Sequence, residues 1–439
     1  MNKDDLKRKV IESIDSNRER IIEIGETIYA NPELGYREHF ATKFVKEEFE
    51  KMGIEVESPL AITGVRAQIN KHKKGPKVVV MGELDSVVCH DHPDANPENG
   101  AIHACGHHVQ TAAMMGVFIG LNEANVLDEL DGKIDFIAVP AEEYIEIEYR
   151  SELRETGKIK YLGGKQELAR LGYLDDVDLA MMIHSTDIEP GKNVIVGPIG
   201  NGFIGKKVQF IGKESHAGGA PEKGINALNA AMLAINNINA QRETFLDSDH
   251  IRVHPIITKG GDIVNVVPAD VRMETYVRAR TIKGMMEANE KVNRSLIAGA
   301  YAVGGKVKIT EIPGYLPLLR EDNLTALFKE NAQMFIREDE IIDGFEFAGS
   351  TDFGDLTHVM PAIHPLIGGV EGFLHTREFA MEDPETAYIL SAKIMAMTVI
   401  DLLFDGAKKA NQIIDDFEPL MTMKEYLAYL EENSKVIEK

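Results

Sequence analysis

The residues best suited to chemistry are a cysteine and histidines in segment 103–108 and further donors downstream. The segment is His-Ala-Cys-Gly-His-His, and the later donors come after short apolar runs. Thiolate, imidazole and carboxylate groups are ligands that transition metals favour. Together with the Glu142-Glu143 pair, His184 and His375, the segment offers one thiolate, one carboxylate and three imidazoles as candidate metal ligands. A catalytic zinc usually takes three protein ligands plus water, so five donors and a spare carboxylate predict two ions and a metal-dependent hydrolase.

Length and composition indicate an ordinary globular protein of two domains. The chain has 439 residues, of which 44% are hydrophobic and 27% charged. A chain of this length exceeds what one hydrophobic core usually serves. Acidic residues outnumber basic ones by 71 to 48, giving a formal net charge of -23. Such a charge repels nucleic acid and anionic lipid, so neither is expected as a partner.

Features of secreted and membrane proteins are not found in the sequence. The N-terminal residues are polar and charged and lack the apolar core of a secretory signal. No run approaches the roughly 18 apolar residues that indicate a spanning helix. The two cysteines, Cys89 and Cys105, are too few for a disulfide framework. We therefore expect a cytoplasmic protein.

The donors occupy favourable places in the predicted secondary structure. Apolar periodicity predicts helices over 6–29, 40–52 and 107–122, and buried strands of a largely parallel sheet over 77–82, 133–139 and 178–183. The side chains that directly follow a strand are Asp85, Glu142, Glu143 and His184, whereas Cys105 and His107 lie where a loop enters a helix. In open α/β sheets ligands collect at the carboxyl ends of strands, so these groups can converge.

A different pattern between residues 197 and 314 predicts a second domain. Strands are expected at 206–212, 251–258, 271–279 and 306–312, with helices at 224–242 and 285–303. This β-α-β-β-α-β order is the split βαβ arrangement of ferredoxin-like domains. We therefore predict an α/β protein whose first domain comprises residues 1–196 and 315–439, with residues 197–314 inserted into it.

An ordered set of motifs resembles one enzyme family. The motifs are Asn31-Pro-Glu-Leu-Gly-Tyr-Arg-Glu, His103-Ala-Cys-Gly-His, Pro140-Ala-Glu-Glu, Ser215-His-Ala-Gly, Gly349-Ser-Thr-Asp-Phe and the late His375. Over roughly residues 20 to 400, the chain resembles the aminoacylase and carboxypeptidase-G-like metallopeptidases. It is most similar to the branch that holds auxin-conjugate amidohydrolases, hippurate hydrolases and aminobenzoyl-glutamate hydrolases. The resemblance implies a zinc-aminopeptidase-like catalytic domain with an inserted ferredoxin-like lid or dimerisation domain.

The resemblance also implies roles for individual residues. The residues that match the metal ligands are Cys105, His107, Glu143, His184 and His375, and the Cys105 thiolate would bridge the ions. Glu142 matches the general base, and His216 matches a histidine that approaches the scissile carbonyl, in some relatives from the partner subunit. Asn265 and Arg278 match positions near the substrate carboxylate. The cofactors would be two divalent ions, for which thiolate and imidazole favour zinc, while manganese or cobalt can serve in vitro.

Taken singly, the same residues have ordinary alternatives. Cys105 alone would more often be a small buried apolar residue. His216 can cap the turn that its neighbouring glycines form. Arg278 can be a surface charge at a strand end. Asp85 can cap a loop or, as we favour, orient a ligand imidazole. The tempting cluster Cys89-His90-Asp91-His92 is interpreted as a loop beside the site, since prolines and a glycine follow it.

Three departures from the family pattern concern the site. The usual Gly-His-Asp-x-His is here Gly106-His-His-Val-Gln110, and Gly349-Ser-Thr-Asp replaces the commoner Gly-Ser-Glu-Asp. Where relatives have a short glycine-rich turn after Glu143, this chain has a longer, charged insertion over 144–164. We expect the insertion to lie beside the active centre and to reshape substrate entry.

The expected activity is hydrolysis of the amide bond of an N-acyl or N-aroyl amino acid by a metal-bound water, with an N-acetyl or aminobenzoyl-glutamate-like substrate. One alternative is a dipeptidase or carboxypeptidase on the same scaffold. The other is a metal-binding protein without catalysis, which the retention of Glu142 argues against. A small-molecule substrate and, by resemblance, a homodimer are the expected partners.

Overall fold

The computed structural model describes residues 1–439, and these form two compact units. Unit 1 contains Met1–Ile199, Leu319–Glu346 and Leu356–Met423, and unit 2 contains Gly200–Leu318, Phe347–Asp355 and Lys424–Lys439. The predicted insertion at 197–314 corresponds to most of unit 2. The C-terminal segment, expected in the first domain, belongs to unit 2 instead, because β19 (Val436–Glu438) pairs with β13 (Lys306–Pro313). The role of unit 2 as a lid or dimerisation domain stays a prediction.

Unit 1 is built on a mostly parallel sheet of order β1-β2-β6-β3-β7-β15. The strands from β6 to β15 are parallel, and β1 and β2 continue the sheet in antiparallel pairing. Its strands are β1 Val56–Leu60, β2 Gly64–Ile69, β3 Lys77–Glu83, β6 Lys133–Val139, β7 Leu179–Met181 and β15 Ala362–Ile363. A further sheet has the order β14-β9-β16-β8, with strands β14 Ile341–Phe347, β9 Val194–Gly200, β16 Leu366–Ile367 and β8 His184–Ser185. Two short two-stranded sheets pair β4 Val87–Val88 with β5 Ala101–Ile102 and β17 Val370–Glu371 with β18 Ala380–Met381. The parallel order confirms the predicted fold class.

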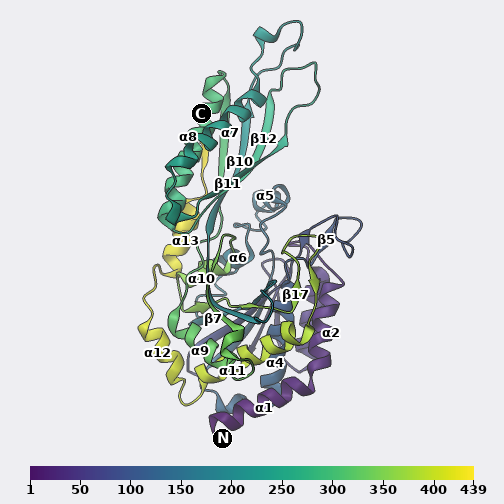
Figure 1. Ribbon diagram of the computed structural model, residues 1–439, viewed down its shortest axis with the longest axis vertical. Helices are drawn as coiled ribbons and strands as arrows, with labels where there is room; N and C mark the ends of the chain where they lie inside the picture. Colours follow the sequence, from purple (N-terminus) through teal and green to yellow (C-terminus); the bar gives the residue numbers. More distant parts are fainter. The chain divides into compact units, whose positions relative to one another are not determined.

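The buried helix α4 (His107–Glu123) organises the core of unit 1. Nearly all its side chains are buried because it packs on β3 while α1, α2 and α11 pack against it (Figure 1). The other helices of unit 1 are α1 Lys3–Ser16, α2 Arg18–Tyr29, α3 His39–Lys51, α5 Ile147–Glu155, α6 Gly164–Arg170, α9 Asp322–Ala332, α11 Ser391–Leu403 and α12 Lys408–Asp416. The single helix expected over 6–29 is two helices, since Asn17 leaves helical geometry. The position of α4 on β3 therefore sets where Cys105 and His107 lie relative to the sheet.

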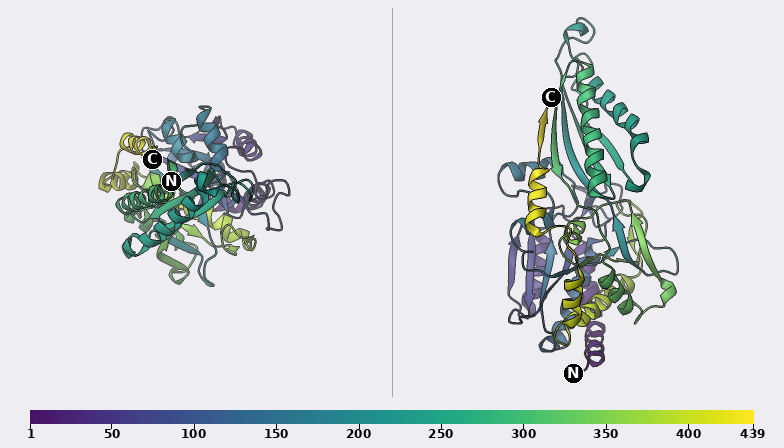
Figure 2. Two further views of the ribbon diagram at one scale, coloured as in Figure 1. Left: turned by 90° about the horizontal axis from the view of Figure 1, so that it is seen from above. Right: turned by 90° about the vertical axis from the view of Figure 1, so that its left-hand side faces the viewer.

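Unit 2 has the predicted ferredoxin-like arrangement. Its antiparallel sheet has the order β11-β12-β10-β13-β19, and α7 and α8 pack together against the sheet (Figure 2). The elements are β10 Gly202–Ile211, α7 Ala227–Gln241, β11 Arg252–Lys259, β12 Asp270–Ala279, α8 Ile282–Ala302 and β13 Lys306–Pro313. Two shorter helices, α10 Phe353–Thr357 and α13 Met423–Glu432, span the boundaries between the units.

One helical stretch, Glu385–Leu403, is long and apolar enough to cross a membrane by length and composition, with a mean hydropathy of 1.5. The sequence pattern did not reveal it, because polar and charged side chains interrupt the apolar run. In the structure 83% of this stretch is buried, and α11 within it packs against α1, α4 and α9. Such burial is typical of a core helix.

Candidate metal centre

The predicted donors of unit 1 gather at the carboxyl edge of the parallel sheet. Asp85 follows β3, Glu142 and Glu143 follow β6, and His184 begins β8 just after β7. Cys105 lies just before α4, which begins at His107. All of these side chains except that of His184 are buried. The expected convergence of distant segments is therefore present.

Gly106 allows the chain to enter α4 at this point. Its φ is +79°, a left-handed conformation that costs an L-residue with a side chain about 1 kcal/mol or more. A Cβ at this position would lie 1.9 Å from the Ser185 Oγ atom. Glycine therefore satisfies both the backbone and the spacing that place Cys105 and His107 beside β8.

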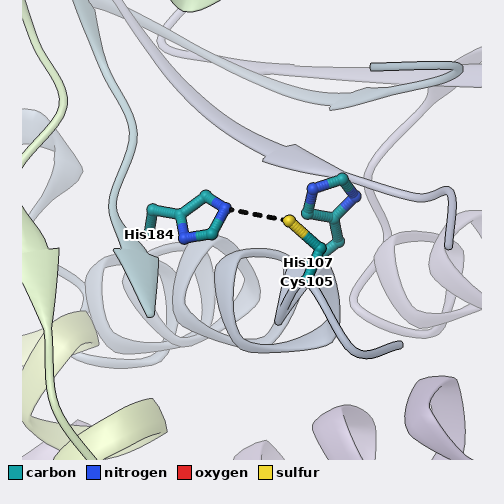
Figure 3. Close-up of side chains that lie close together, drawn as sticks. All are labelled: Cys105, His107 and His184. Atoms are coloured by element: carbon teal, nitrogen blue, oxygen red, sulfur yellow. Dashed lines mark hydrogen bonds between the residues drawn. The ribbon is translucent and has the colours of Figure 1, made fainter. Parts of the chain in front are cut away.

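Cys105 belongs to two groups of possible ligands. In one group it lies with His107 and His184, and in the other with Glu143 and His375; the ligand atoms within each group lie within 4.8 Å of one another. Figure 3 shows the His184 imidazole directed at the Cys105 thiol, with a separation of 3.5 Å between Nε2 and Sγ. On the other side, His375 Nε2 lies 2.9 Å from Glu143 Oε1. A sulfur shared by two ligand groups is the arrangement that a bridging thiolate requires.

Backbone carbonyls set the orientation of two imidazoles. His107 Nδ1 lies 2.8 Å from the carbonyl oxygen of Asp85, and His184 Nδ1 lies 2.7 Å from that of Ser185. A carbonyl accepts only, so each Nδ1 donates its proton, and Nε2 is the ring nitrogen that remains for a ligand. His107 Nε2 is buried and has no hydrogen-bond partner. An imidazole held in this way fits a metal ion.

Asp85 contacts two of the predicted donor residues, and its role in orienting a ligand imidazole stays a prediction. Its Oδ1 lies 3.2 Å from His107 Nδ1, and its Oδ2 accepts a hydrogen bond of 2.9 Å from the backbone N–H of Glu143. Asp85 itself is fully buried. It therefore links the His107 imidazole to the backbone of Glu143.

The charges of the cluster compensate one another. Burial and the Glu143 carboxylate raise the pKa of the Cys105 thiol, but the three neighbouring imidazoles outweigh them and lower this pKa to about 6. Glu143 raises the pKa of His375 to about 12 against the opposing effect of burial. Burial also acts on Glu143, yet His375 holds the pKa of that carboxyl well below its usual range. Thiolate and carboxylate are the forms that bind cations.

A buried acid that the sequence analysis did not single out lies against the site. Glu83, the last residue of β3, forms a possible ligand group with His107 and Glu142, and its Oε2 is 3.1 Å from His107 Nε2. Burial raises the pKa of Glu83, but Lys165 and His107 lower it to about 2. Gln110 donates to Glu83 Oε2 at 2.9 Å. The glutamine that departs from the family pattern is thus the partner of Glu83.

The alternation of side chains along a strand could have pointed to Glu83. Glu83 and Asp85 are separated by one residue at a strand end, so both can point to the same side. Its cation, Lys165, comes from α6 and is fully buried, with a Nζ–Oε1 distance of 2.5 Å. Such a long-range pairing could not be inferred from spacing.

The other predicted site residues lie in unit 2. His216 and Asn265 are neighbours there: His216 forms an isolated bridge with Val266, and the N–H of Ala217 donates to the Asn265 carbonyl at 2.9 Å. Arg278, in β12, donates to Ser350 Oγ at 2.8 Å. His216 Nδ1 also accepts from the N–H of Gly219 at 2.9 Å, the turn-capping contact considered from the sequence. Unit 2 therefore places two of the three together and Arg278 on a separate strand.

The loop cluster after β4 has local roles, in agreement with its interpretation as a loop. His92 Nε2 lies 2.8 Å from the carbonyl oxygen of Phe379, and its Nδ1 accepts from the N–H of Asp94 at 3.1 Å. Neither Cys89 nor these residues form a group with metal-ligand spacing.

The sheet, the buried helix and the clustered thiol, imidazole and carboxylate groups define a metallohydrolase. A family model, peptidase family M20/M25/M40, matches residues 41–400. The chain belongs to this family and is a metallo-amidohydrolase or peptidase.

Among similar proteins, the Xaa-Arg dipeptidase of Mus musculus is 30% identical over 92% of this chain and 90% of its own length. The IAA-amino acid hydrolase ILR1-like 4 of Arabidopsis thaliana is 26% identical over 79% of this chain and 77% of its own length. A solved structure of a dinuclear metal-binding M20 peptidase from Bacillus subtilis is 22% identical, covers 89% of this chain and 99% of its own, and has a TM-score of 0.66. These likenesses agree with the family that the motifs indicated.

Proposed function

We propose that the protein hydrolyses the amide bond of an N-acyl or N-aroyl amino acid and releases the free amino acid. The observation that carries the proposal is a pair of possible metal-ligand groups, five side chains in all, that have Cys105 in common, with the carboxylate of Glu142 close to His107. Glu142 Oε2 lies 3.8 Å from His107 Nε2, close enough to act on a group held there. The IAA-amino acid hydrolase among the relatives supports an N-acyl amino acid as substrate.

Two divalent ions are proposed as cofactors, one for each ligand group. Cys105, His107 and His184 would hold one ion, and Cys105, Glu143 and His375 the other. The His107 Nε2 atom, which makes no hydrogen bond, fits this use. Thiolate and imidazole ligands favour zinc. When bound, the ions supply Lewis acidity that polarises the substrate carbonyl and lowers the pKa of a water.

The protein side chains would divide the remaining work. Glu142 takes the proton of the attacking water and passes it to the leaving nitrogen, the role of a general acid–base. We propose that His216 donates to the oxyanion that develops on the carbonyl. Arg278 can fork onto the substrate carboxylate, with Asn265 as a second donor. The Asp85 carboxylate keeps His107 and Glu143 aligned during the reaction.

A second candidate is a dipeptidase on the same scaffold. The Xaa-Arg dipeptidase of mouse matches nearly the full length of this chain, which favours a dipeptide with a basic C-terminal residue. The excess of acidic residues, 71 against 48, would attract such a substrate. The two candidates differ in one chemical requirement, a free amino group next to the scissile amide.

A release assay separates the candidates. The zinc-loaded or manganese-loaded protein is given N-acetyl, N-benzoyl and aminobenzoyl-glutamate substrates together with dipeptides that end in arginine or lysine. Release of amino acid from acylated substrates, with no gain from a free amino group, supports the first proposal. Turnover of dipeptides alone favours the second. Absence of release from the entire panel would contradict both.

We also propose a cytoplasmic location, which rests on the presence of only two cysteines in the sequence. Both cysteines are free thiols. Fractionation of cells that express a tagged full-length chain tests this proposal.

A further inference from the structure

The two neighbouring glutamates of the site depend on a bend in the backbone between β6 and α5. In an extended segment, adjacent side chains point to opposite sides. Here Glu142 and Glu143 approach the same imidazole, with carboxylate oxygens 3.8 and 4.0 Å from His107 Nε2. The residue before them, Ala141, has a φ of +54°, in the left-handed region. The bend at Ala141 therefore accompanies the shared orientation of both acids.

This conformation is unfavourable for alanine by itself. Its Cβ lies too close to the following carbonyl oxygen in the left-handed region, where glycine is the usual occupant. Strain of this kind persists only where the surroundings hold the backbone, and it concentrates at active sites. The contacts of the Ala141 backbone show what holds it.

Two buried ionisable side chains hold opposite ends of Ala141. Its N–H donates to Glu38 Oε1 at 2.7 Å, and its carbonyl oxygen accepts from Arg150 Nη1 at 3.1 Å. Glu38 is fully buried, and Arg150 is 1% exposed. The Arg150 guanidinium is charged, and a charged donor makes a stronger hydrogen bond than a neutral one. The carbonyl oxygen also accepts from the backbone N–H of Gly164 at 3.2 Å, so Arg150 adds a charged donor to this acceptor while Glu38 binds the N–H.

Both side chains are themselves anchored. The other oxygen of Glu38 accepts from Thr63 Oγ1 at 2.5 Å. Arg150 Nη1 also donates to the Leu162 carbonyl at 2.9 Å, and its Nη2 lies 3.9 Å from Asp85 Oδ2. Gly35 leaves the space that the guanidinium fills, because a Cβ there would lie 2.1 Å from Nη2. The guanidinium therefore connects the bend to the carboxylate that orients His107.

We propose that Glu38 and Arg150 are positioning residues that clamp Ala141 in its left-handed bend and so direct Glu142 and Glu143 at the metal centre. Arg150 lies in α5, within the 144–164 insertion, so the insertion supplies a buried cation beneath the site. The inference rests on the roles proposed above for Glu142 and Glu143. The insertion then has a positioning role in the site, which differs from the expected effect on substrate entry.

The first test removes each contact and compares it with a conservative change. Glu38→Leu removes the acceptor for the Ala141 N–H, whereas Glu38→Gln keeps a carbonyl oxygen in its place. Arg150→Met removes the donors, and Arg154→Met on the same helix is the matched control. We expect Glu38→Leu and Arg150→Met to lower kcat by at least ~10-fold with KM nearly unchanged, and to weaken zinc binding by about 10–100-fold. Glu38→Gln and Arg154→Met should stay close to the wild type.

Zinc binding is measured on metal-free protein by competition with a chromophoric chelator, so it does not depend on finding the right substrate. Circular dichroism identifies variants that fail to fold. Folded Glu38→Leu and Arg150→Met proteins with wild-type zinc affinity would overturn the clamp. Weakened zinc binding in a protein that hydrolyses none of the panel would support the clamp and count against the proposed function alone.

The second test changes the strained residue. Glycine adopts the left-handed region freely, so Ala141→Gly should restore part of the kcat and zinc affinity lost in Glu38→Leu. Ala141→Val should reproduce the loss, because a β-branched side chain is strongly disfavoured at positive φ. A role of Glu38 in general stability predicts no recovery with glycine. Absence of recovery in a folded double variant would therefore overturn the proposal.

Discussion

At the scale of single residues, the shared thiol of Cys105 is the feature with the clearest consequence. It belongs to both ligand groups, whereas His375 belongs to one. The loss of one ligand weakens the binding of the ion that it holds, and the loss of a shared ligand weakens the binding of both ions. The two substitutions should therefore differ in the number of ions that remain.

Elemental analysis of carefully loaded protein measures this difference. We expect the wild type to hold roughly two ions per chain, His375→Ala roughly one, and Cys105→Ala fewer than one, as each tetrahedral site loses a ligand. Cys89→Ala, which changes the other free cysteine, is the control and should match the wild type. Two firmly bound ions in Cys105→Ala would exclude the bridging role.

The base assignment gives a second prediction at this scale. Glu142→Gln should keep its metal content but lose about 10²–10⁴-fold in kcat, because an amide cannot accept the proton of the attacking water. Glu148→Gln, which changes an exposed acid in the 144–164 insertion, is the control. Steady-state kinetics on the preferred substrate provide the measurement. Activity near that of the wild type in Glu142→Gln would end the assignment.

At the scale of elements, buried ion pairs fix helices to the core of unit 1. Lys7 of α1 donates to Asp401 Oδ2 in α11 and to Asn331 Oδ1 in α9, each at 2.6 Å. Both charged side chains are more than nine-tenths buried. Removal of one partner leaves the other charge buried without compensation, which is costly. This contact therefore attaches the N-terminal helix to two helices from the far end of the chain.

We expect Asp401→Asn to lower the free energy of unfolding by about 2–4 kcal/mol at neutral pH. Burial raises the pKa of Asp401, but Lys3 and Lys7 outweigh it and lower this pKa below its usual value. A carboxyl with a depressed folded pKa stabilises the protein above its unfolded pKa of ~3.9 and loses this contribution as the pH falls through the folded value.

Urea unfolding at several pH values measures the effect. The difference between wild type and Asp401→Asn should be constant above about pH 5 and shrink below about pH 4. Asp405→Asn, which breaks an exposed pair with Lys408, should cost less than about 1 kcal/mol. A difference that grows as the solution is acidified would contradict the role of the ionised carboxylate.

At the scale of the whole molecule, the sheet edge of unit 2 is a candidate contact surface for the homodimer that the resemblance implies. Strand β11 ends the sheet order, so one row of its backbone groups is unpaired. Apolar side chains lie exposed on it and on α7, with Ile256 at 60% and Met232 at 55% exposure. An apolar sheet edge invites pairing with a second strand. A second copy of this chain is the occupant that the family resemblance suggests.

Light scattering after size exclusion should give a mass near twice the 48.6 kDa of one chain. Ile256→Lys combined with Met232→Glu should shift the protein to the monomer, because charges on both surfaces oppose their burial. Met334→Glu, on a comparably exposed residue of unit 1, is the control and should remain dimeric. A wild-type protein that is monomeric at all accessible concentrations would contradict the proposal.

Much of the fold could be predicted because its signals are local. The apolar runs at β3 and β6 and the helical period of α4 follow from side-chain pattern, and the element order of unit 2 follows from the alternation of such patterns. The C-terminal strand β19 was missed, since three residues at a sheet edge carry little periodicity. Its pairing with β13 is a contact between segments more than a hundred residues apart.

The sequence by itself determined the donor types, the strand ends that carry them, and thus the class of chemistry, because ligand preference and strand periodicity are properties of short segments. Only the tertiary structure decided which donors form a ligand group with Cys105, and that Glu83 lies against His107 and Glu142. It also decided that Glu38 and Arg150 meet at the Ala141 peptide. These contacts join segments with no common period or spacing, and they form only when the packing of the sheet and helices brings those segments together.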